Sequence, residues 1–363
     1  MCAISNKQSN NLKKIPNCLD EKYFNYNIFG AILLNWILLY SLRGTTGTDA
    51  GGYWHFYKII YTTNTSFWWT YNAMRDKLFQ VMIWGMTNLF HGMWIPACAV
   101  MGFILYAPVL YIIKEKSIDP LFSCLMYIFT MSIYFGFNGV RQGLSMGLAS
   151  MAFYCFLKEK KYYGYILLML IAYGFHSATM IIVPFHIIML QKINSIRSVL
   201  IVLGFILCYI YLMELWGSMI GILSDLGQNK FASNFRVISK RNMNRGSYLR
   251  ILVSASILTF GIIKYKTLSK LFPDYDIDMW VIILGVCSAV FTRKFVYFAR
   301  VGTYISYGMM LTVPKLTYAF GKNNARNVKY IIGILYFFYM IAFLLHGDSD
   351  LYPYIPVWIS ERY

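Results

Sequence analysis

Long hydrophobic runs recur along the whole chain and are separated by short polar connections. The runs do not alternate strictly between apolar and polar positions, so they indicate helices rather than strands. A helix needs roughly 20 apolar residues to cross a bilayer, or about 17 at the short end, and several runs reach that length only with flanking Trp, Tyr and Lys. The runs are Asn27–Leu42, Trp94–Ile113, Leu121–Phe137, Gly143–Leu157, Tyr162–Phe175, Ala178–Leu190, Val199–Met213, Ile251–Ile263, Met279–Phe291, Gly302–Val313 and Tyr330–Leu345.

This pattern predicts an all-α polytopic membrane protein with about 11–12 transmembrane helices, because lipid does not tolerate open sheets. Composition supports the class: 58% of the residues are hydrophobic and 13% are charged, against roughly 45–50% and about 25% in soluble domains. We expect a cytoplasmic tail at residues 1–26, which lacks the features of a cleavable signal peptide. A single transmembrane domain follows at 27–346, with outward loops at 43–77 and 214–250 and an outward C-terminal segment at 347–363.

Five short basic connections fall on the same side of the membrane if the runs cross alternately. They are Lys114–Ser117, Lys158–Lys161, Gln191–Arg197, Lys264–Lys270 and Gly321–Lys329. The positive-inside rule makes this side cytoplasmic. The Lys-rich tail shares it only if the segment Leu78–Met93 does not cross on its own, so we expect that segment to lie at the interface or to re-enter.

The net charge of +18 does not indicate nucleic-acid binding, because the positive residues occur in short clusters between the apolar runs. No basic patch interleaved with stacking aromatic residues stands in a soluble segment, so we expect no nucleic-acid partner. The seven cysteines have neither disulfide nor metal-ligand spacing, and we expect no metal site and no cofactor.

Arg141 is the one charged side chain between Pro120 and Leu157. An arginine at membrane depth costs roughly 2.5–3.5 kcal/mol on insertion scales, so it usually lines a cavity or meets a partner. Arg141 falls on the predicted outward side, where it would meet an anion. The alternatives are an arginine that snorkels to the interface or one that pairs with a distant carboxylate.

Other arginines of the same side strengthen the case for an anion, and we add Arg43, Arg293 and Arg300 to the candidate binding residues. Arg300 begins an apolar run, so we expect it to be buried. Guanidinium groups bind phosphate oxygens with two parallel hydrogen bonds. An outward-facing membrane enzyme has no nucleotide supply, so the predicted phosphate substrate is a lipid-linked diphosphate.

Glycosyl transfer from such a lipid requires a group that accepts the proton of the attacking hydroxyl, and two residues are candidates. His176, at the end of an apolar run, is one, and a neutral imidazole is a suitable base. Asp49, in a glycine-rich stretch, is the other. The alternative for His176 is a core histidine bonded to a carbonyl, and for Asp49 a simple turn residue.

Several short motifs, in this order, resemble the EpsG-like, Wzy-type polysaccharide polymerases of bacterial envelopes. They are GTDAGGYWHFY at Gly47–Tyr57, NGVRQGLSMGLA at Asn138–Ala149, KEKKYYGYILLMLIAYGFHSATMIIVPF at Lys158–Phe185, RKFVYFARVGTYISYGMMLTVP at Arg293–Pro314 and YPY at Tyr352–Tyr354. Asp49, Arg141, Gln142, His176 and Arg300 stand at matching motif positions. Tyr53, Tyr352 and Tyr354 also do, and His55 and the basic stretch Lys230–Arg250 have no counterpart in the pattern.

The resemblance implies a metal-independent glycosyltransferase with GT-C-like architecture in the bacterial inner membrane. Its N-terminus would be cytoplasmic and its active site would face the periplasm. It would polymerise undecaprenyl-diphosphate-linked oligosaccharide repeat units, as in O-antigen synthesis, with one such lipid as donor and another as acceptor. Membrane lipids and a chain-length regulator protein are the other implied partners. Arg141 and Arg300 would contact the diphosphate, and His176 or Asp49 would activate the acceptor hydroxyl.

Three other classes remain open on the sequence. A flippase or exporter of lipid-linked oligosaccharides also needs arginines in a cavity, but it needs no base, and transporters often contain internal repeats that this chain lacks. A membrane acyltransferase would take its acyl donor from the cytoplasm, opposite to the predicted site. A non-catalytic assembly protein is the third.

Overall fold

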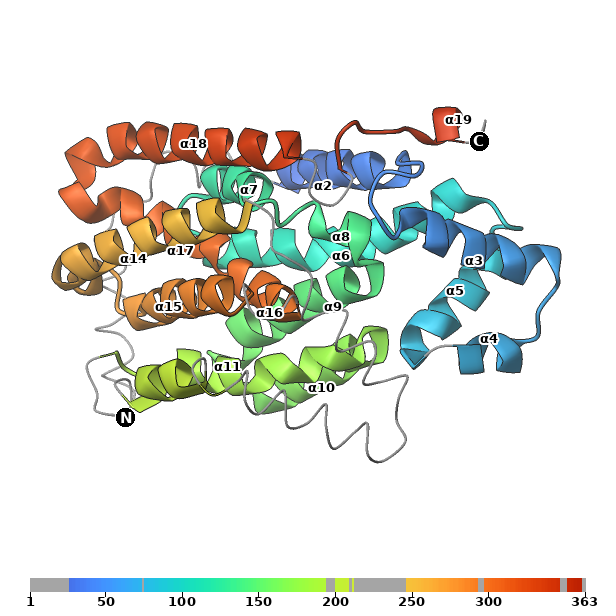
Figure 1. Cartoon of the computed structure of the whole chain (residues 1–363), viewed down its shortest axis with the longest axis horizontal. Helices are drawn as coiled ribbons and strands as arrows, with labels where there is room; N and C mark the ends of the chain where they lie inside the picture. The colour runs from blue at the N-terminus through green and yellow to red at the C-terminus, as the bar shows by residue number, and fades with distance from the viewer. Residues whose placement is uncertain are drawn as a thin grey trace. The chain divides into compact units, whose positions relative to one another are not determined.

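The computed structural model describes residues 26–73, 75–193, 200–208, 211, 246–292, 297–346 and 351–360 (Figure 1). Within these ranges the chain is almost entirely helical, and its β interaction is a single antiparallel bridge between Arg43 and Pro356. The prediction of an all-α protein is confirmed. The chain forms two compact units, residues 1–183 with 310–363 and residues 184–309.

The first unit contains most of the helices. They are α2 (Tyr26–Ser41), α3 (Ala50–Thr62), α4 (Phe67–Ala73), α5 (Lys77–Leu89), α6 (Trp94–Lys116), α7 (Pro120–Phe129), α8 (Phe135–Asn138), α9 (Val140–Met151), the π-helical turns η1 (Ala152–Leu157), α10 (Tyr162–Phe175), the 3₁₀ helix η2 (Ser177–Ile181), α17 (Met309–Leu316), the 3₁₀ helix η3 (Thr317–Phe320), α18 (Lys322–Leu345) and α19 (Val357–Ser360). The second unit holds α14 (Gly246–Leu271), α15 (Tyr275–Thr292) and α16 (Tyr297–Ser306), and α11 (Ile182–Met189) lies across the boundary.

Four of the described helices are long and apolar enough to cross a membrane, namely α6, residues Tyr248–Leu271 of α14, α15 and α18. Shorter apolar helices add α2, α7, α10 and the stretch Ser177–Met189. The chain is therefore a polytopic membrane protein. The expected total of about 11–12 crossings stays a prediction.

Two of the predicted apolar runs are interrupted between successive helices. The run 121–137 is divided between α7, which ends at Phe129, and the short α8. Between them Met131 adopts a left-handed conformation, with φ of +63°, that a continuing helix does not permit. The run 302–313 is likewise divided, between α16 and α17. In the run 199–213, residues 200–208 and 211 are described and are helical, and the others lie outside the described residues.

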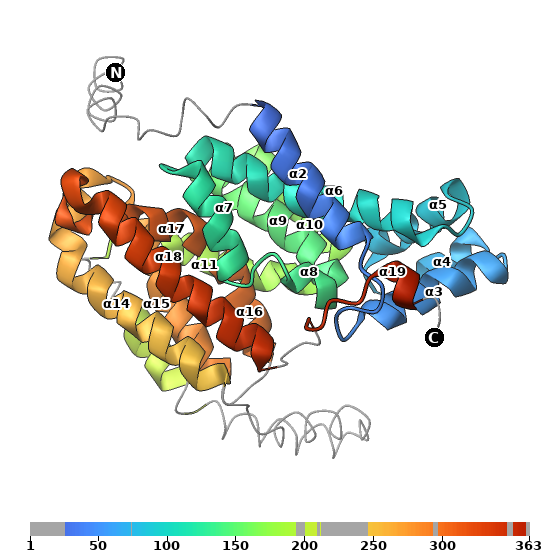
Figure 2. The ribbon, with the colours of Figure 1, turned by 90° about the horizontal axis from the view of Figure 1, so that it is seen from above.

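The core of the first unit is built on α2 and α6, which pack along each other in opposite directions (Figure 2). At one end, the ammonium of Lys114 lies 3.9 Å from the ring centre of Tyr26. Toward the other end, Tyr40 contacts Tyr106 with ring centres 6.0 Å apart. Both helices bury large apolar side chains at these contacts, and such burial is the main favourable contribution of packing.

Helix α9 packs against α6 at unusually short range because glycines line the contact. A Cβ added to Gly143 would lie 2.9 Å from Gly136 and 3.1 Å from Leu105, and one added to Gly147 would lie 3.0 Å from the Leu105 carbonyl oxygen. Small residues of this kind let membrane helices approach closely. The close approach fixes the start of α9, which carries Arg141.

The basic connections of the first unit gather at one end of it. Lys116 pairs with Glu159, which also pairs with Lys161. Nearby, Lys329 at the start of α18 lies 2.6 Å from the carboxylate of Asp119. The connections at 114–117, 158–161 and 321–329 therefore meet one another, and the start of α2 joins them through Tyr26.

The opposite end of this unit carries α3, α4 and α5. Helix α2 reaches this end at Ser41 and α6 leaves it at Trp94, so residues 43–93 begin and end on the same side of the unit. Helix α5 has 13 residues, which at 1.5 Å per residue gives about 20 Å, short of a bilayer core of roughly 30 Å. This arrangement agrees with the expectation that Leu78–Met93 does not cross the membrane on its own. The depth of this segment in a bilayer stays a prediction.

The second unit consists of helices packed in sequence, α14 on α15 and α15 on α16. The hydroxyl of Tyr265 donates to Asp276 across the α14–α15 contact at 2.5 Å. The indole of Trp280 donates to the carbonyl of Gln191 at 2.8 Å. Gly302 lies against Ser288, where an added Cβ would come within 2.5 Å of the hydroxyl.

Candidate functional site

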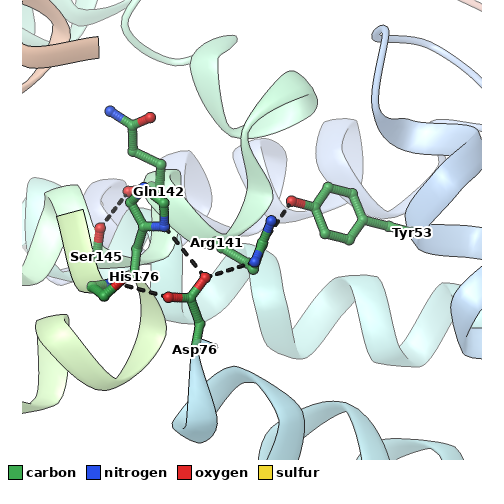
Figure 3. A network of polar contacts seen from close by, with 7 residues as sticks. Tyr53, Asp76, Arg141, Gln142, Ser145 and His176 are labelled. Carbon is green, nitrogen blue, oxygen red and sulfur yellow. Dashed lines mark hydrogen bonds and ion pairs between the residues drawn. The ribbon is translucent and has the colours of Figure 1, made fainter. Parts of the chain in front are cut away.

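Asp76 occupies the centre of a polar cluster at the end of the first unit that lies opposite the basic connections (Figure 3). It is the N-cap residue of α5, a position at which aspartate normally accepts a hydrogen bond from its own helix. Its side chain makes no such bond. The carboxylate, which is 3% exposed, is directed at residues of two other helices instead.

Arg141, in the first turn of α9, provides the first of these contacts. Its Nη1 lies 2.7 Å from Oδ2 of Asp76, and its Nε donates to the hydroxyl of Tyr53 at 3.3 Å. Nη2 has no partner among the described residues, and the side chain is 30% exposed. Of the alternatives for this arginine, the distant carboxylate is therefore present, and one edge of the guanidinium remains available to a ligand.

His176 provides the second contact, where α10 ends and η2 begins. Its extended backbone, with φ of −155° and ψ of 110°, ends α10. Nδ1 then lies 3.4 Å from Oδ2 of Asp76, and the next residue, Ser177, donates its backbone N–H to Oδ1 at 2.9 Å. The other ring nitrogen, Nε2, is buried and has no hydrogen-bond partner among the described residues.

The surroundings of Asp76 keep it ionised. Burial alone would raise the pKa of this carboxyl. The hydrogen bonds from His176 and from the Ser177 N–H, together with the charge of Arg141, outweigh burial and lower the pKa to about 2. A carboxylate with two hydrogen-bond donors and a guanidinium beside it is a fixed negative charge that orients both neighbours. Asp76 is therefore suited to hold His176 and Arg141 in place.

Asp49 and Gln142 do not join this cluster. Asp49 is exposed at the N-cap of α3, and its side chain makes no capping hydrogen bond. Gln142 follows Arg141 on α9, is buried, and points its amide away from Asp76 (Figure 3). The proposed contacts of both residues with substrate stay predictions.

Arg43 is fully buried rather than open to substrate. Its guanidinium lies 4.0 Å from the ring centre of Tyr40 and 5.0 Å from that of Phe137. It donates to the Tyr40 hydroxyl at 3.0 Å and to the carbonyl of Gly136 at 3.4 Å. No carboxylate among the described residues pairs with it, so the two rings and these hydrogen bonds stabilise the buried charge.

The tyrosines of the predicted site have different surroundings. Tyr53 bonds Arg141 and packs edge-on against Phe79, with ring centres 5.7 Å apart. Tyr354 donates its hydroxyl to the carbonyl of Leu39 at 2.8 Å, and Tyr352 is exposed. Of these three, the structure brings Tyr53 alone into the cluster.

Of the remaining predicted arginines, Arg300 belongs to the second unit. Arg300 lies on α16 and is exposed, so the expectation that it is buried is wrong. Arg293 lies outside the described residues. Joint binding of a diphosphate by Arg141 and Arg300 stays a prediction.

A comparison with family models decides the family. A model described as the EpsG family matches residues 26–356. The chain belongs to the EpsG family. No curated protein and no solved structure matches the chain.

EpsG membership supports a role as a polysaccharide polymerase, and it confirms the resemblance seen in the motifs. Two of those motifs are in direct contact in this EpsG protein, because the backbone N–H of Thr48 donates to Oδ1 of Asn138 at 2.9 Å. Gly47, with φ of +100°, allows this approach, since an added Cβ would lie 2.7 Å from that oxygen. The GTD and NGVRQ motifs thus form one structural feature.

Asp76 is the residue of this cluster that sequence reasoning missed in this EpsG protein. It lies in the predicted outward stretch 43–77, between Arg75 and Lys77, where an acidic residue looks like a partner of its neighbours. The available signal was its position directly before a predicted helix. An aspartate there usually caps that helix, and the sequence does not show that its carboxylate is used elsewhere.

Proposed function

We propose that this EpsG protein is a membrane glycosyltransferase that polymerises undecaprenyl-diphosphate-linked oligosaccharide repeat units at the outer face of the bacterial inner membrane. The observation that carries the proposal is the shared contact of Asp76 with Arg141 and His176. It joins a cation suited to a diphosphate with an imidazole suited to a hydroxyl. Glycosyl transfer from a lipid diphosphate needs both.

The proposed reaction uses these groups in one displacement. The hydroxyl of the acceptor sugar attacks C1 of the donor sugar, the C1–O bond to the diphosphate breaks, and undecaprenyl diphosphate leaves. His176 Nε2 takes the proton of the attacking hydroxyl, because Nδ1 is held by Asp76. Arg141 stabilises the negative charge that grows on the leaving diphosphate. Because this charge is larger in the transition state than in the bound donor, Arg141 stabilises the transition state more.

Asp76 is a positioning residue in this scheme. By binding Nδ1 it selects the tautomer in which Nε2 carries the free lone pair. By binding Nη1 of Arg141 it leaves Nη2 as the nitrogen that reaches a phosphate oxygen. The described conformation is closed around the imidazole, because Nε2 is buried, so the acceptor must displace the groups that cover it.

The same proposal includes two further candidates, Asp49 and Arg300. Asp49 is exposed four residues before Tyr53, whose backbone N–H donates to the Asp49 carbonyl, and its carboxylate would bind acceptor hydroxyls. Arg300 would add a second charge for the diphosphate. The scheme uses no metal and no cofactor. A GT-C-like arrangement and a partner that regulates chain length belong to the same proposal.

The proposed orientation rests on the two ends of the first unit. The basic connections meet at one end, whereas Arg141 and His176 lie at the other. By the positive-inside rule the first end is cytoplasmic, which puts the cluster on the outer face. The flipped, lipid-linked repeat units would be present on that face.

The test uses the purified protein in liposomes with a lipid-linked oligosaccharide as the sole other component. We expect glycans of two or more repeat units, and we expect Arg141→Ala protein to leave single units. If lipid-linked units move across the bilayer but do not lengthen, the protein is a flippase. If neither occurs with protein that folds normally, an assembly role replaces the proposal.

A further inference from the structure

The C-terminal segment packs against the connection between α2 and α3, more than 300 positions away in sequence (Figure 2). The carbonyl of Ile355 accepts from the N–H of Gly44 at 2.7 Å and from the hydroxyl of Thr46 at 3.1 Å. The N–H of Ile355 donates back to the same hydroxyl at 2.7 Å. The N–H of Val357 donates to the Leu42 carbonyl at 2.9 Å.

The same connection is fixed on its other side to the residues just before α9. The Asn138 amide oxygen accepts from Thr48, and the carbonyl of Gly136 accepts from Arg43. The guanidinium of Arg43 also covers the Phe137 ring. Residues 42–48 therefore lie between the C-terminal segment and residues 136–138. We call these three segments, 42–48, 136–138 and 354–357, the brace.

The brace ends one turn from the site. Gly139 caps α9, and Arg141 stands in the first turn of that helix. On the other side, α3 begins at Ala50, directly after the Gly47–Thr48 contact, and carries Tyr53 to the Nε of Arg141. The brace thus fixes the backbone that presents Arg141 and the backbone that presents its hydroxyl partner.

We propose that the C-terminal segment is a positioning element for Arg141, which acts through Thr46 and Asn138 and touches no substrate. The buried Thr46 is suited to this role because its one hydroxyl both donates to and accepts from Ile355. Tyr354 and Arg43 also act as positioning residues. The hydroxyl of Tyr354 donates to the Leu39 carbonyl, and the buried guanidinium of Arg43 donates to the Gly136 carbonyl and lies over the Phe137 ring, so both stabilise the brace.

This inference goes beyond the proposed function, because it concerns a structural coupling that exists whatever the reaction is. It predicts that damage at Thr46 is felt at the start of α9. A segment that only covers the surface would produce no such effect. Hydrogen–deuterium exchange of the full-length protein in detergent measures this coupling without any activity assay.

The test compares Thr46→Val, which keeps the shape and removes the hydroxyl, with Thr46→Ser, which keeps the hydroxyl. In Thr46→Val we expect exchange to rise several-fold in residues 42–48 and 351–357, and also in the peptide 135–146. Thr46→Ser should restore slow exchange in all three. A matched control is Thr62→Val, since the hydroxyl of Thr62 is exposed and bonds its own helix.

A second variant approaches the brace from the other side. Asn138→Ala should speed exchange at Thr48 and in 135–146. Asn138→Asp keeps the acceptor oxygen, so exchange at these positions should rise less. If Thr46→Val does not accumulate, Tyr354→Phe removes one outer hydrogen bond and should produce the same pattern more weakly. A rise confined to 42–48 and 351–357 in every variant would overturn the proposal.

Glycan length separates this inference from the proposed function. If Thr46→Val shortens the glycan at normal protein level, with faster exchange in 135–146, the brace positions a working site. If exchange in 135–146 rises in Thr46→Val while Arg141→Ala protein still makes long glycans, the positioning role of the brace is confirmed and the proposed role of Arg141 in the reaction is wrong. If Thr46→Val makes long glycans and exchange in 135–146 is unchanged, the brace has no positioning role.

Discussion

Oδ2 of Asp76 lies 2.7 Å from Nη1 of Arg141, although 65 positions separate the two residues in the chain. The same oxygen lies 3.4 Å from Nδ1 of His176. One carboxylate oxygen therefore faces both a guanidinium and an imidazole. Changes at Asp76 should consequently affect two residues at once.

Asp76→Asn tests this shared contact. The amide keeps the shape of the side chain and an oxygen for the Ser177 N–H, but it removes the charge beside Arg141. Breaking a fully buried ion pair costs about 3–5 kcal/mol. Because Arg141 is partly exposed, we expect about 1–3 kcal/mol of lost stability, with most polymerising activity lost as well. Thermal unfolding in detergent and glycan length from cells measure the two effects.

A double variant shows whether the effects of Asp76 and Arg141 are coupled. Asp76→Asn and Arg141→Gln should each destabilise the protein, because each leaves the charge of the other residue unpaired. The combined variant leaves no unpaired charge, so it should cost less than the sum of the two. Additive effects would show that the pair contributes nothing. Asp276→Asn, in the second unit, is a control that removes a carboxylate bonded to Tyr265.

Substitutions at Arg141 itself test its role with the diphosphate. Lysine keeps the charge but replaces the planar fork by a single ammonium, so it cannot bond Asp76, Tyr53 and a phosphate in the same way. We expect Arg141→Lys and Arg141→Ala to lose roughly 10²–10³ in rate, the usual effect of removing a donor to a developing oxyanion. Glycan length beside membrane protein level is the measurement. Near-normal long chains from Arg141→Ala at normal abundance would rule the role out.

The sequence was sufficient to find Arg141 but not its partner. A lone charge in an apolar stretch is conspicuous, and its cost in lipid makes a functional reading reasonable. Asp76 stands among polar residues, where one more carboxylate carries no signal. His176 was found because it interrupts an apolar run. The contact between these residues depends on the direction in which α10 ends and α5 begins, which composition does not determine.

The fold shows the same division between what the sequence reveals and what it does not. Apolar runs predicted the long helices α6 and α18 well, because length and hydropathy alone identify them. The division of the run 121–137 depends on the left-handed turn at Met131, a residue with no preference for that conformation. The packing of Ile355 against Thr46 joins residues 309 positions apart, and no local pattern encodes it.

His176 and Asp49 can be distinguished by their substitutions. His176→Gln keeps polarity but removes the base, and general-base catalysis contributes typically 10²–10⁴-fold, so we expect a loss of that size. Asp49 is exposed and its side chain makes no capping hydrogen bond, so Asp49→Asn should mainly weaken acceptor binding. Initial rates at several acceptor concentrations separate the two. If Asp49→Asn loses as much rate as His176→Gln at saturating acceptor, Asp49 would be the base.

The low pKa of Asp76 predicts how stability depends on pH. Its folded value of about 2 lies below the ordinary 3.8, so ionised Asp76 stabilises the folded state. This contribution is fully present above about pH 4 and is lost as pH falls toward 2. A shift of this size corresponds to about 2 kcal/mol at 1.36 kcal/mol per unit. The stability of the wild type should therefore decline between pH 5 and 2.5, and Asp76→Asn should reduce this decline. Equal declines in stability in the two proteins would contradict the pKa shift.

The orientation of the cluster is tested last, with single cysteines in a background without the native ones. Ser66 is exposed on the connection between α3 and α4, at the end of the unit that carries Arg141, and Lys161 is exposed at the basic end. Because residues 43–93 return to the end from which they start, we expect these two sites on opposite faces of the membrane. A membrane-impermeant thiol reagent should label Ser66→Cys in intact cells and Lys161→Cys only after permeabilisation. Labelling of Lys161→Cys from outside would reverse the orientation and put the cluster on the cytoplasmic face, where no flipped repeat unit could reach it.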